Sequence, residues 1–86
     1  MRGNFFYYRL GSSIVRTREK RRISQEQLAF RCGVDRTYIS RIEQGRANPT
    51  IKVIEKIATA LKTRLHYLLR NCFFLIIIRN ALENIY

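Results

Sequence analysis

Apolar residues recur at helical spacing near the start of the chain. Leu10, Ile14 and Val15 fall on one face of a helix, and this pattern predicts a first helix over about residues 9–22. The other face of that helix carries basic side chains, so one side is expected to pack and the other to face solvent.

A short second helix is predicted next, because residues suited to its two ends are present. Ser24 is followed three residues later by Gln27, the spacing of a capping box. The helix then covers residues 25–32 and buries Leu28. Gly33 follows it and can take the left-handed conformation that ends many helices.

A third helix is predicted over residues 36–44 in the same way. Asp35 is a suitable N-cap, Ile39 and Ile42 form an inward stripe, and Gly45 follows the helix. Two helices joined by a tight glycine turn are therefore expected in the middle of the chain.

Two further helices are predicted after the single proline of the sequence. Thr50 can cap a helix whose wide apolar face includes Ile54, Ile57 and Leu61. A shorter fifth helix is expected over 64–69.

The two ends of the chain give a mixed pattern. The aromatic run from Phe5 to Tyr8 and the apolar run over 73–78 favour strands by composition. Leu75, Ile78 and Leu82 also share one helical face, so we favour helix over strand for residues 71–85. The fold expected is all-α, with an N-terminal aromatic arm (1–9), a five-helix domain (10–70) and a C-terminal apolar segment (71–86).

Charge is the first indication of function. The 86 residues, enough for one domain, carry a formal net charge of +11, and the sequence pI is about 10.7. Such a domain has the electrostatic character of a protein that binds a phosphate backbone. A basic surface kept for solubility, or binding to an anionic membrane, would give the same composition.

Several function classes lack the residues they need. Cys32 and Cys72 lie far apart and His66 is the only histidine, which excludes a four-ligand zinc site from one chain. No glycine-rich phosphate loop or nucleophile beside His66 is present, so neither an enzyme nor a cofactor is expected. The longest apolar run, over 72–78, is too short for a membrane span, and two free thiols fit a cytoplasmic protein.

The two short helices have a physical use together. The major groove of DNA admits one α-helix, and the helix before it can direct its N-terminal amides at phosphate. The segment SQEQLAFRCGVDRTYISRIEQGRANPTIKVIEKIATAL resembles the phage-repressor and Cro type of helix-turn-helix domain over residues 10–69. Within that family, DRTYISRIEQG resembles the controller proteins of restriction–modification genes.

The expected site residues follow from this motif and the resemblance. Base edges would be read by the third helix, through Arg36, Thr37, Ser40 and Arg41. The DNA backbone would be met by Ser24, Gln25, Tyr38, Arg46 and Asn48. The resemblance also implies an ion pair between Arg18 and Glu43. Simpler alternatives are ordinary solvated charges at Arg36 and Arg41, and a packing role for Tyr38.

Three positions depart from the family pattern. Lys62 stands where relatives often have glycine, Arg64 where they often have a serine cap, and Ala47 where some have a basic residue. A shorter or differently entered fifth helix is therefore expected, together with one DNA contact fewer in the loop.

The family implies a homodimer that binds a palindromic operator as a repressor or autoregulator. Seven successive apolar residues cannot all face one small core, so a dimer or partner surface is expected at Leu65, Leu68, Leu69, Phe73, Phe74, Ile76 and Ile77. The alternatives are a tail folded back on residues 5–8, an antitoxin whose C-terminal segment binds a protein partner, and a membrane-surface peptide.

Overall fold

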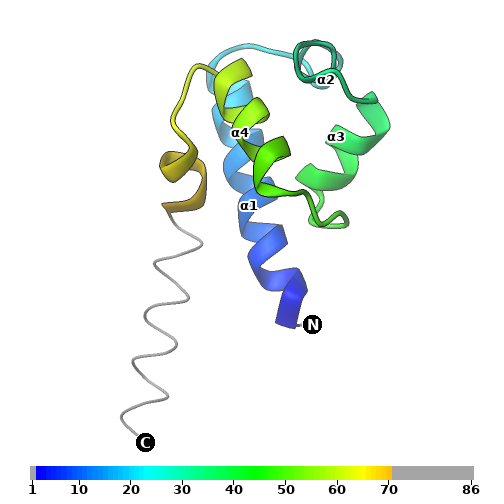
Figure 1. Ribbon diagram of the computed structural model, residues 1–86, viewed down its shortest axis with the longest axis vertical. Coiled ribbons are helices and arrows are strands. Elements are labelled where there is room, and N and C mark those ends of the chain that lie inside the picture. Colours follow the sequence, from blue (N-terminus) through cyan, green and yellow to red (C-terminus); the bar gives the residue numbers. More distant parts are fainter. Residues whose placement is uncertain (1, 71–86) are drawn as a thin grey trace, which may run out of the picture.

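A computed structural model describes residues 2–70 of the chain, and these residues are helices joined by short turns (Figure 1). No strand occurs in this part of the chain, so the all-α fold predicted from the sequence is confirmed. The elements are α1 (Arg2–Lys20), α2 (Gln25–Cys32), α3 (Arg36–Glu43) and α4 (Ile51–Ala60), followed by a helical segment over 65–70.

Helix α1 begins at Arg2, so the predicted start near residue 9 and the strand preference of the aromatic run are wrong. Contacts within the helix and with the core outweigh the β propensity of these residues. Phe6 packs against the core and meets Tyr7 edge to face, with ring centroids 5.4 Å apart. The Arg9 guanidinium carbon lies 5.4 Å from the ring centroid of Phe5, one turn earlier.

The predicted capping box of α2 is confirmed. The Ser24 hydroxyl accepts a hydrogen bond from the Gln27 amide at 3.0 Å, and the Ser24 amide donates to the Gln27 side-chain oxygen at 2.9 Å. Gly33 ends the helix in the left-handed region, at φ 70°. Because both ends of this two-turn helix are satisfied locally, its length is set by the sequence itself.

Helix α3 has a weaker N-terminal cap than its sequence predicts. Asp35 has the extended backbone of an N-cap, but its carboxylate makes no capping hydrogen bond. The helix ends at Glu43, and Gly45 then turns the chain at φ 74°. Helix α4 is capped as predicted, since the Thr50 hydroxyl accepts from the Val53 amide at 3.2 Å.

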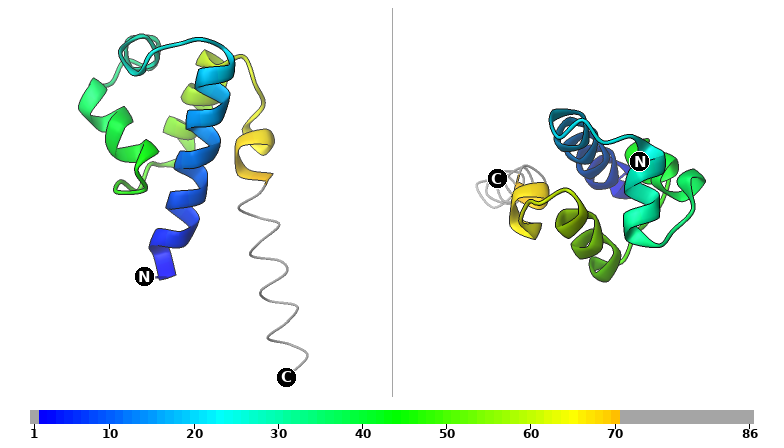
Figure 2. Two further views of the ribbon diagram at one scale, coloured as in Figure 1. Left: turned by 180° about the vertical axis from the view of Figure 1, so that it is seen from behind. Right: turned by 90° about the horizontal axis from the view of Figure 1, so that it is seen from above.

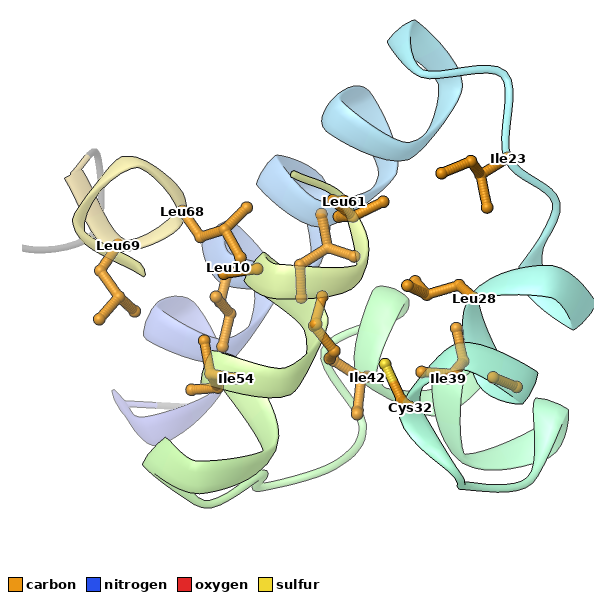
Figure 3. Close-up of a cluster of buried hydrophobic side chains, with 14 residues drawn as sticks. Leu10, Ile23, Leu28, Cys32, Ile39, Ile42, Ile54, Leu61, Leu68 and Leu69 are labelled. Carbon is orange, nitrogen blue, oxygen red and sulfur yellow. The ribbon is translucent and has the colours of Figure 1, made fainter. Parts of the chain in front are cut away.

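One hydrophobic core holds the helices together (Figure 3). Its members come from every helix and from the turn before α2: Leu10, Ile14, Ile23, Leu28, Ala29, Cys32, Ile39, Ile42, Ile54, Ile57, Ala58, Leu61, Leu68 and Leu69. Because α1 and α4 occupy the middle of the molecule, α3 and the 65–70 segment lie on opposite sides of it (Figures 1 and 2).

Two residues predicted to meet a partner belong to this core instead. Leu68 is 0% exposed and Leu69 4% exposed within the single chain, and Figure 3 shows Leu68 beside Leu10 and Leu61. The apolar face of the fifth helix is thus used to close the bundle. Leu65 is half-buried against the core. The other predicted partner residues, Phe73, Phe74, Ile76 and Ile77, lie outside the described residues, as does the segment on which the antitoxin alternative depends.

Candidate nucleic-acid interface

Helices α2 and α3 form a tight pair. The Val34 amide donates to the Ala29 carbonyl at 3.0 Å, so the turn at Gly33 directs the chain away from the axis of α2. Figure 1 shows α2 end-on and α3 from the side, so the two axes are steeply inclined. One face of α3 is buried by this packing and the other is presented outward.

A buried carboxylate fixes the position of α3 against α1 and α2. Glu43, whose side chain is 3% exposed, accepts from Arg18 Nε at 2.7 Å and from Arg18 Nη2 at 3.2 Å. Gln25 Nε2 donates to the same carboxylate at 2.8 Å. The remaining Arg18 contact, from Nη1 to the Ile23 carbonyl at 2.9 Å, also ties in the turn before α2. The ion pair thus joins α1 to α3, and the hydrogen bond from Gln25 adds α2. Hydrogen bonds satisfy both charges of the pair.

The four predicted base-reading side chains lie on the outward side of α3. Arg36, Thr37 and Arg41 are exposed, and Ser40 is half-buried. The only carboxylate within α3 is the buried Glu43, so the helix itself adds no negative charge to this outward face. Such a surface can donate hydrogen bonds and attract a polyanion.

Sequence reasoning missed one member of this surface, Gln44. Its Nε2 donates to Ser40 Oγ at 3.2 Å, which leaves the Ser40 hydroxyl hydrogen available as a donor. The signal was present in the sequence, because residues four apart on a helix are neighbours.

The residues predicted to contact the DNA backbone differ in their exposure and in the hydrogen bonds that they already make. Ser24 is committed to its cap and Gln25 to Glu43. Tyr38 is half-buried and packs against the core, so the packing alternative describes at least part of its role. Arg46 and Asn48 are exposed in the loop between α3 and α4.

The described residues offer little of what a metal site, a reactive side chain or a membrane span would require. Among residues 2–70, no three potential metal-ligating side chains lie together. His66 is exposed. Cys32 is buried, and burial raises the pKa of its thiol, an effect that the positive charge of Lys56 partly offsets. None of the helices in this part of the chain is long and apolar enough to cross a bilayer.

The fold agrees with what the chain is similar to. The helix-turn-helix family profile matches residues 14–68, and the protein belongs to this family, in its phage repressor and Cro type. Control protein C.BamHI of Bacillus amyloliquefaciens is 55% identical over 42 residues, 49% of this chain and 52% of that protein. A hypothetical transcription factor of Neisseria meningitidis is 50% identical over 46 residues, 54% of this chain and 43% of that protein.

Solved structures give the same assignment. The restriction–modification controller protein C.AhdI of Aeromonas hydrophila matches with a TM-score of 0.71 and 35% identity, over 72% of this chain and 94% of that one. The hypothetical transcription factor NHTF from Neisseria matches with a TM-score of 0.72 and 39% identity, over 74% of each chain. The chain spans about half the length of the two curated relatives named above. The family places this domain among transcription regulators, not enzymes.

Proposed function

We propose that this protein is a transcription regulator of the cytoplasm that binds a specific sequence in double-stranded DNA. Helix α3 enters the major groove, and Arg36, Thr37, Ser40 and Arg41 read base edges. The observation that carries the proposal is the outward face of α3, which is polar, basic and fixed from behind by the Arg18–Glu43 ion pair. A rigid reading helix is what base recognition requires, because hydrogen bonds to base edges tolerate little displacement.

The individual roles follow from the chemistry of each side chain. Arg36 and Arg41 are exposed, and each can donate two parallel hydrogen bonds to one guanine. Thr37 can contact a thymine methyl group through its own methyl. Ser40, supported by Gln44, donates its hydroxyl hydrogen to a base acceptor.

Backbone contacts hold the domain in register. The amide of Gln25 begins α2 and has no carbonyl partner within the helix, so it is suited to a phosphate. The side-chain amide of Gln25 has two hydrogens, and one of them is donated to Glu43. That bond fixes the direction of the second hydrogen, which can be donated to a phosphate. Arg46, Asn48 and Tyr38 complete the backbone contacts, and Ser24 contributes mainly by shaping the end of α2.

The regulator acts as a homodimer on a palindromic operator and represses transcription, including that of its own gene. Two α3 helices related by a twofold axis would reach half-sites about one helical turn, roughly 34 Å, apart. Leu68 and Leu69 are excluded from the dimer surface because they are buried within one chain. The dimer must use residues outside this core.

The decisive measurement is fluorescence anisotropy with a duplex from upstream of the gene and with a scrambled duplex. We expect tight binding to the first alone, and a loss of about tenfold or more for Arg36→Ala and for Arg41→Ala, as for one lost bidentate base contact. Lys56→Ala, an exposed cation on α4, is the matched control for charge and should change binding by less than about threefold. Equal affinity for both duplexes would refute sequence-specific regulation.

The dimer is tested separately by sedimentation velocity across protein concentration and by the salt dependence of DNA binding. Six or more phosphate contacts predict a slope of log K against log salt of about −5 or steeper. A monomer at tens of micromolar that also binds DNA as a monomer would refute the twofold arrangement, while leaving recognition by α3 intact.

A further inference from the structure

A pocket lies on the opposite side of the molecule from α3. It is bounded by α1 and by the segment that contains Thr63, Tyr67 and Arg70, and its volume is about 550 Å³. Figures 1 and 2 show that α1 and α4 separate this segment from α3. A duplex seated on α3 therefore leaves this pocket uncovered.

The pocket concentrates positive charge. Arg16, Lys20, Arg21 and Arg70 line it, and among residues 2–70 no carboxylate does. Within the part of the chain that the structure describes, none of these four cations takes part in an ion pair, since the pair present joins Arg18 to Glu43. Four like charges around one hollow repel one another, and an anion with several charges would relieve that repulsion.

One of the cations is held by two hydrogen bonds to backbone carbonyls. Arg21 Nε donates to the Leu61 carbonyl at 3.1 Å, and Arg21 Nη2 donates to the Lys62 carbonyl at 3.3 Å. The guanidinium thus caps the C-terminal end of α4, where the helix dipole is negative. Its position beside the pocket is fixed before any ligand arrives, which lowers the entropy lost on binding.

The pocket lining also includes an aromatic ring and side chains that carry hydroxyl groups. Tyr67, 45% exposed, presents an aromatic ring at its edge. The buried Ser13 and Thr17 form the α1 side, with Thr17 Oγ1 donating to the Ser13 carbonyl at 2.9 Å. An aromatic ring beside several cations suits a ligand that has both a planar base and phosphates. The volume is within the range of small-molecule sites.

We propose that this pocket binds a nucleoside polyphosphate, with its phosphates among Arg16, Lys20, Arg21 and Arg70 and its base stacked on Tyr67. A nucleic-acid backbone is a poorer fit, because the hollow accommodates one compact anion whereas a duplex needs an extended surface. The site shares no residue with the α3 surface, so it does not depend on the function proposed above.

The test is isothermal titration calorimetry of the full chain with ATP, tripolyphosphate and adenosine. We expect ATP to bind more tightly than tripolyphosphate by about fivefold, through stacking on Tyr67. Tyr67→Leu should remove this difference without changing tripolyphosphate binding. The double variant Arg16→Gln/Lys20→Gln should weaken ATP binding by about tenfold or more, and glutamine preserves the helix because its helix propensity is high.

The matched control is Lys52→Gln/Lys56→Gln, which removes the same charge from the outer face of α4, where Lys52 and Lys56 are exposed. It should weaken ATP binding by less than about threefold. Equal weakening by both double variants would overturn the proposal, because it would mean that net charge alone attracts ATP. Equal affinity for ATP and tripolyphosphate, or no ATP binding at millimolar concentration, would also overturn it.

A DNA-binding variant separates this proposal from the previous one. Arg36→Ala/Arg41→Ala should lose operator binding and keep ATP binding unchanged. If a short duplex displaces ATP from that variant competitively, the pocket is a nucleic-acid site and the nucleotide assignment is wrong.

Discussion

Gly11 of α1 faces the end of α3 so closely that a Cβ atom on residue 11 would lie 2.5 Å from the carbonyl oxygen of Glu43. The Ile42 carbonyl oxygen would be at the same distance. The two helices therefore touch backbone to backbone, next to the Arg18–Glu43 ion pair. A glycine in the interior of a helix is normally unfavourable. Here it allows α3 to pack closely against α1, because residue 11 has no Cβ atom.

We expect Gly11→Ala to destabilise the protein by about 1–2 kcal/mol. The gain of about 1 kcal/mol in helix propensity is outweighed by overpacking against backbone atoms that cannot rotate away, which typically costs about 1–3 kcal/mol or more. Urea unfolding measures the effect. Ser12→Ala, at the neighbouring half-buried position, should change stability by less than about 0.5 kcal/mol. A stabilised Gly11→Ala variant would show that α1 and α3 do not meet in this way.

Arg18→Met should lower the free energy of unfolding by about 3 kcal/mol, because it leaves the Glu43 carboxylate buried without its cation. Gln25 still donates to that carboxylate, which limits the loss. The double variant Arg18→Met/Glu43→Met should recover part of the stability, since no charge is then buried. A double-mutant cycle by chemical denaturation gives the coupling, and strictly additive effects would contradict the role assigned to the pair.

Lys62→Gly should stabilise the protein by about 0.5–1 kcal/mol. Lys62 has a left-handed backbone, φ 55°, at the end of α4, a conformation that costs a residue with a Cβ about 1 kcal/mol. Its contact with Arg21 uses the Lys62 carbonyl and is kept in the variant. Thermal unfolding should show a higher Tm, and Arg22→Gly, at φ 58°, should act in the same direction. Lys56→Gly, inside α4, should instead lose about 1 kcal/mol.

Stability should fall as the pH rises above the ordinary thiol pKa near 9.0, in part because of Cys32. Burial raises the pKa of this thiol in the folded protein, so at alkaline pH the unfolded chain loses its proton first and is favoured. The contribution is complete below pH 9 and is lost as the pH approaches the folded pKa. In a Cys72→Ser background, denaturation from pH 8 to 10 should show a shallower fall for Cys32→Ala. Parallel curves would exclude the thiol as a cause.

Local signals in the sequence predicted much of the candidate site. The capping box at Ser24 and Gln27 and the left-handed glycine after α2 depend on residues close together in the chain, and their geometry follows from backbone chemistry. The outward position of Arg36 and Arg41 follows from helical periodicity once Ile39 and Ile42 are assigned to the core. These predictions need no knowledge of how the helices pack.

Predictions about the aromatic run and about the fifth helical segment failed where packing decides. The aromatic run at residues 5–8 has strand propensity, but its helical form is held by contacts with a distant segment. A Cβ on Gly45 would lie 2.8 Å from the Tyr8 Cα atom, which shows how closely the loop after α3 approaches α1. The sequence predicts that Leu68 and Leu69 contact a partner, but both are buried in the core of the single chain. The sequence does not show which apolar face packs inside the helical bundle.

The sequence by itself determined the helices with clear caps, the outward chemistry of α3 and the basic character of the domain, because each depends on neighbours within a few residues. Only the tertiary structure decided the length of α1, the burial of the fifth helical segment and the pocket of four cations. Those features bring together residues that are far apart in the chain, such as Lys20 and Arg70. Their proximity is a consequence of packing, which the order of the residues does not reveal.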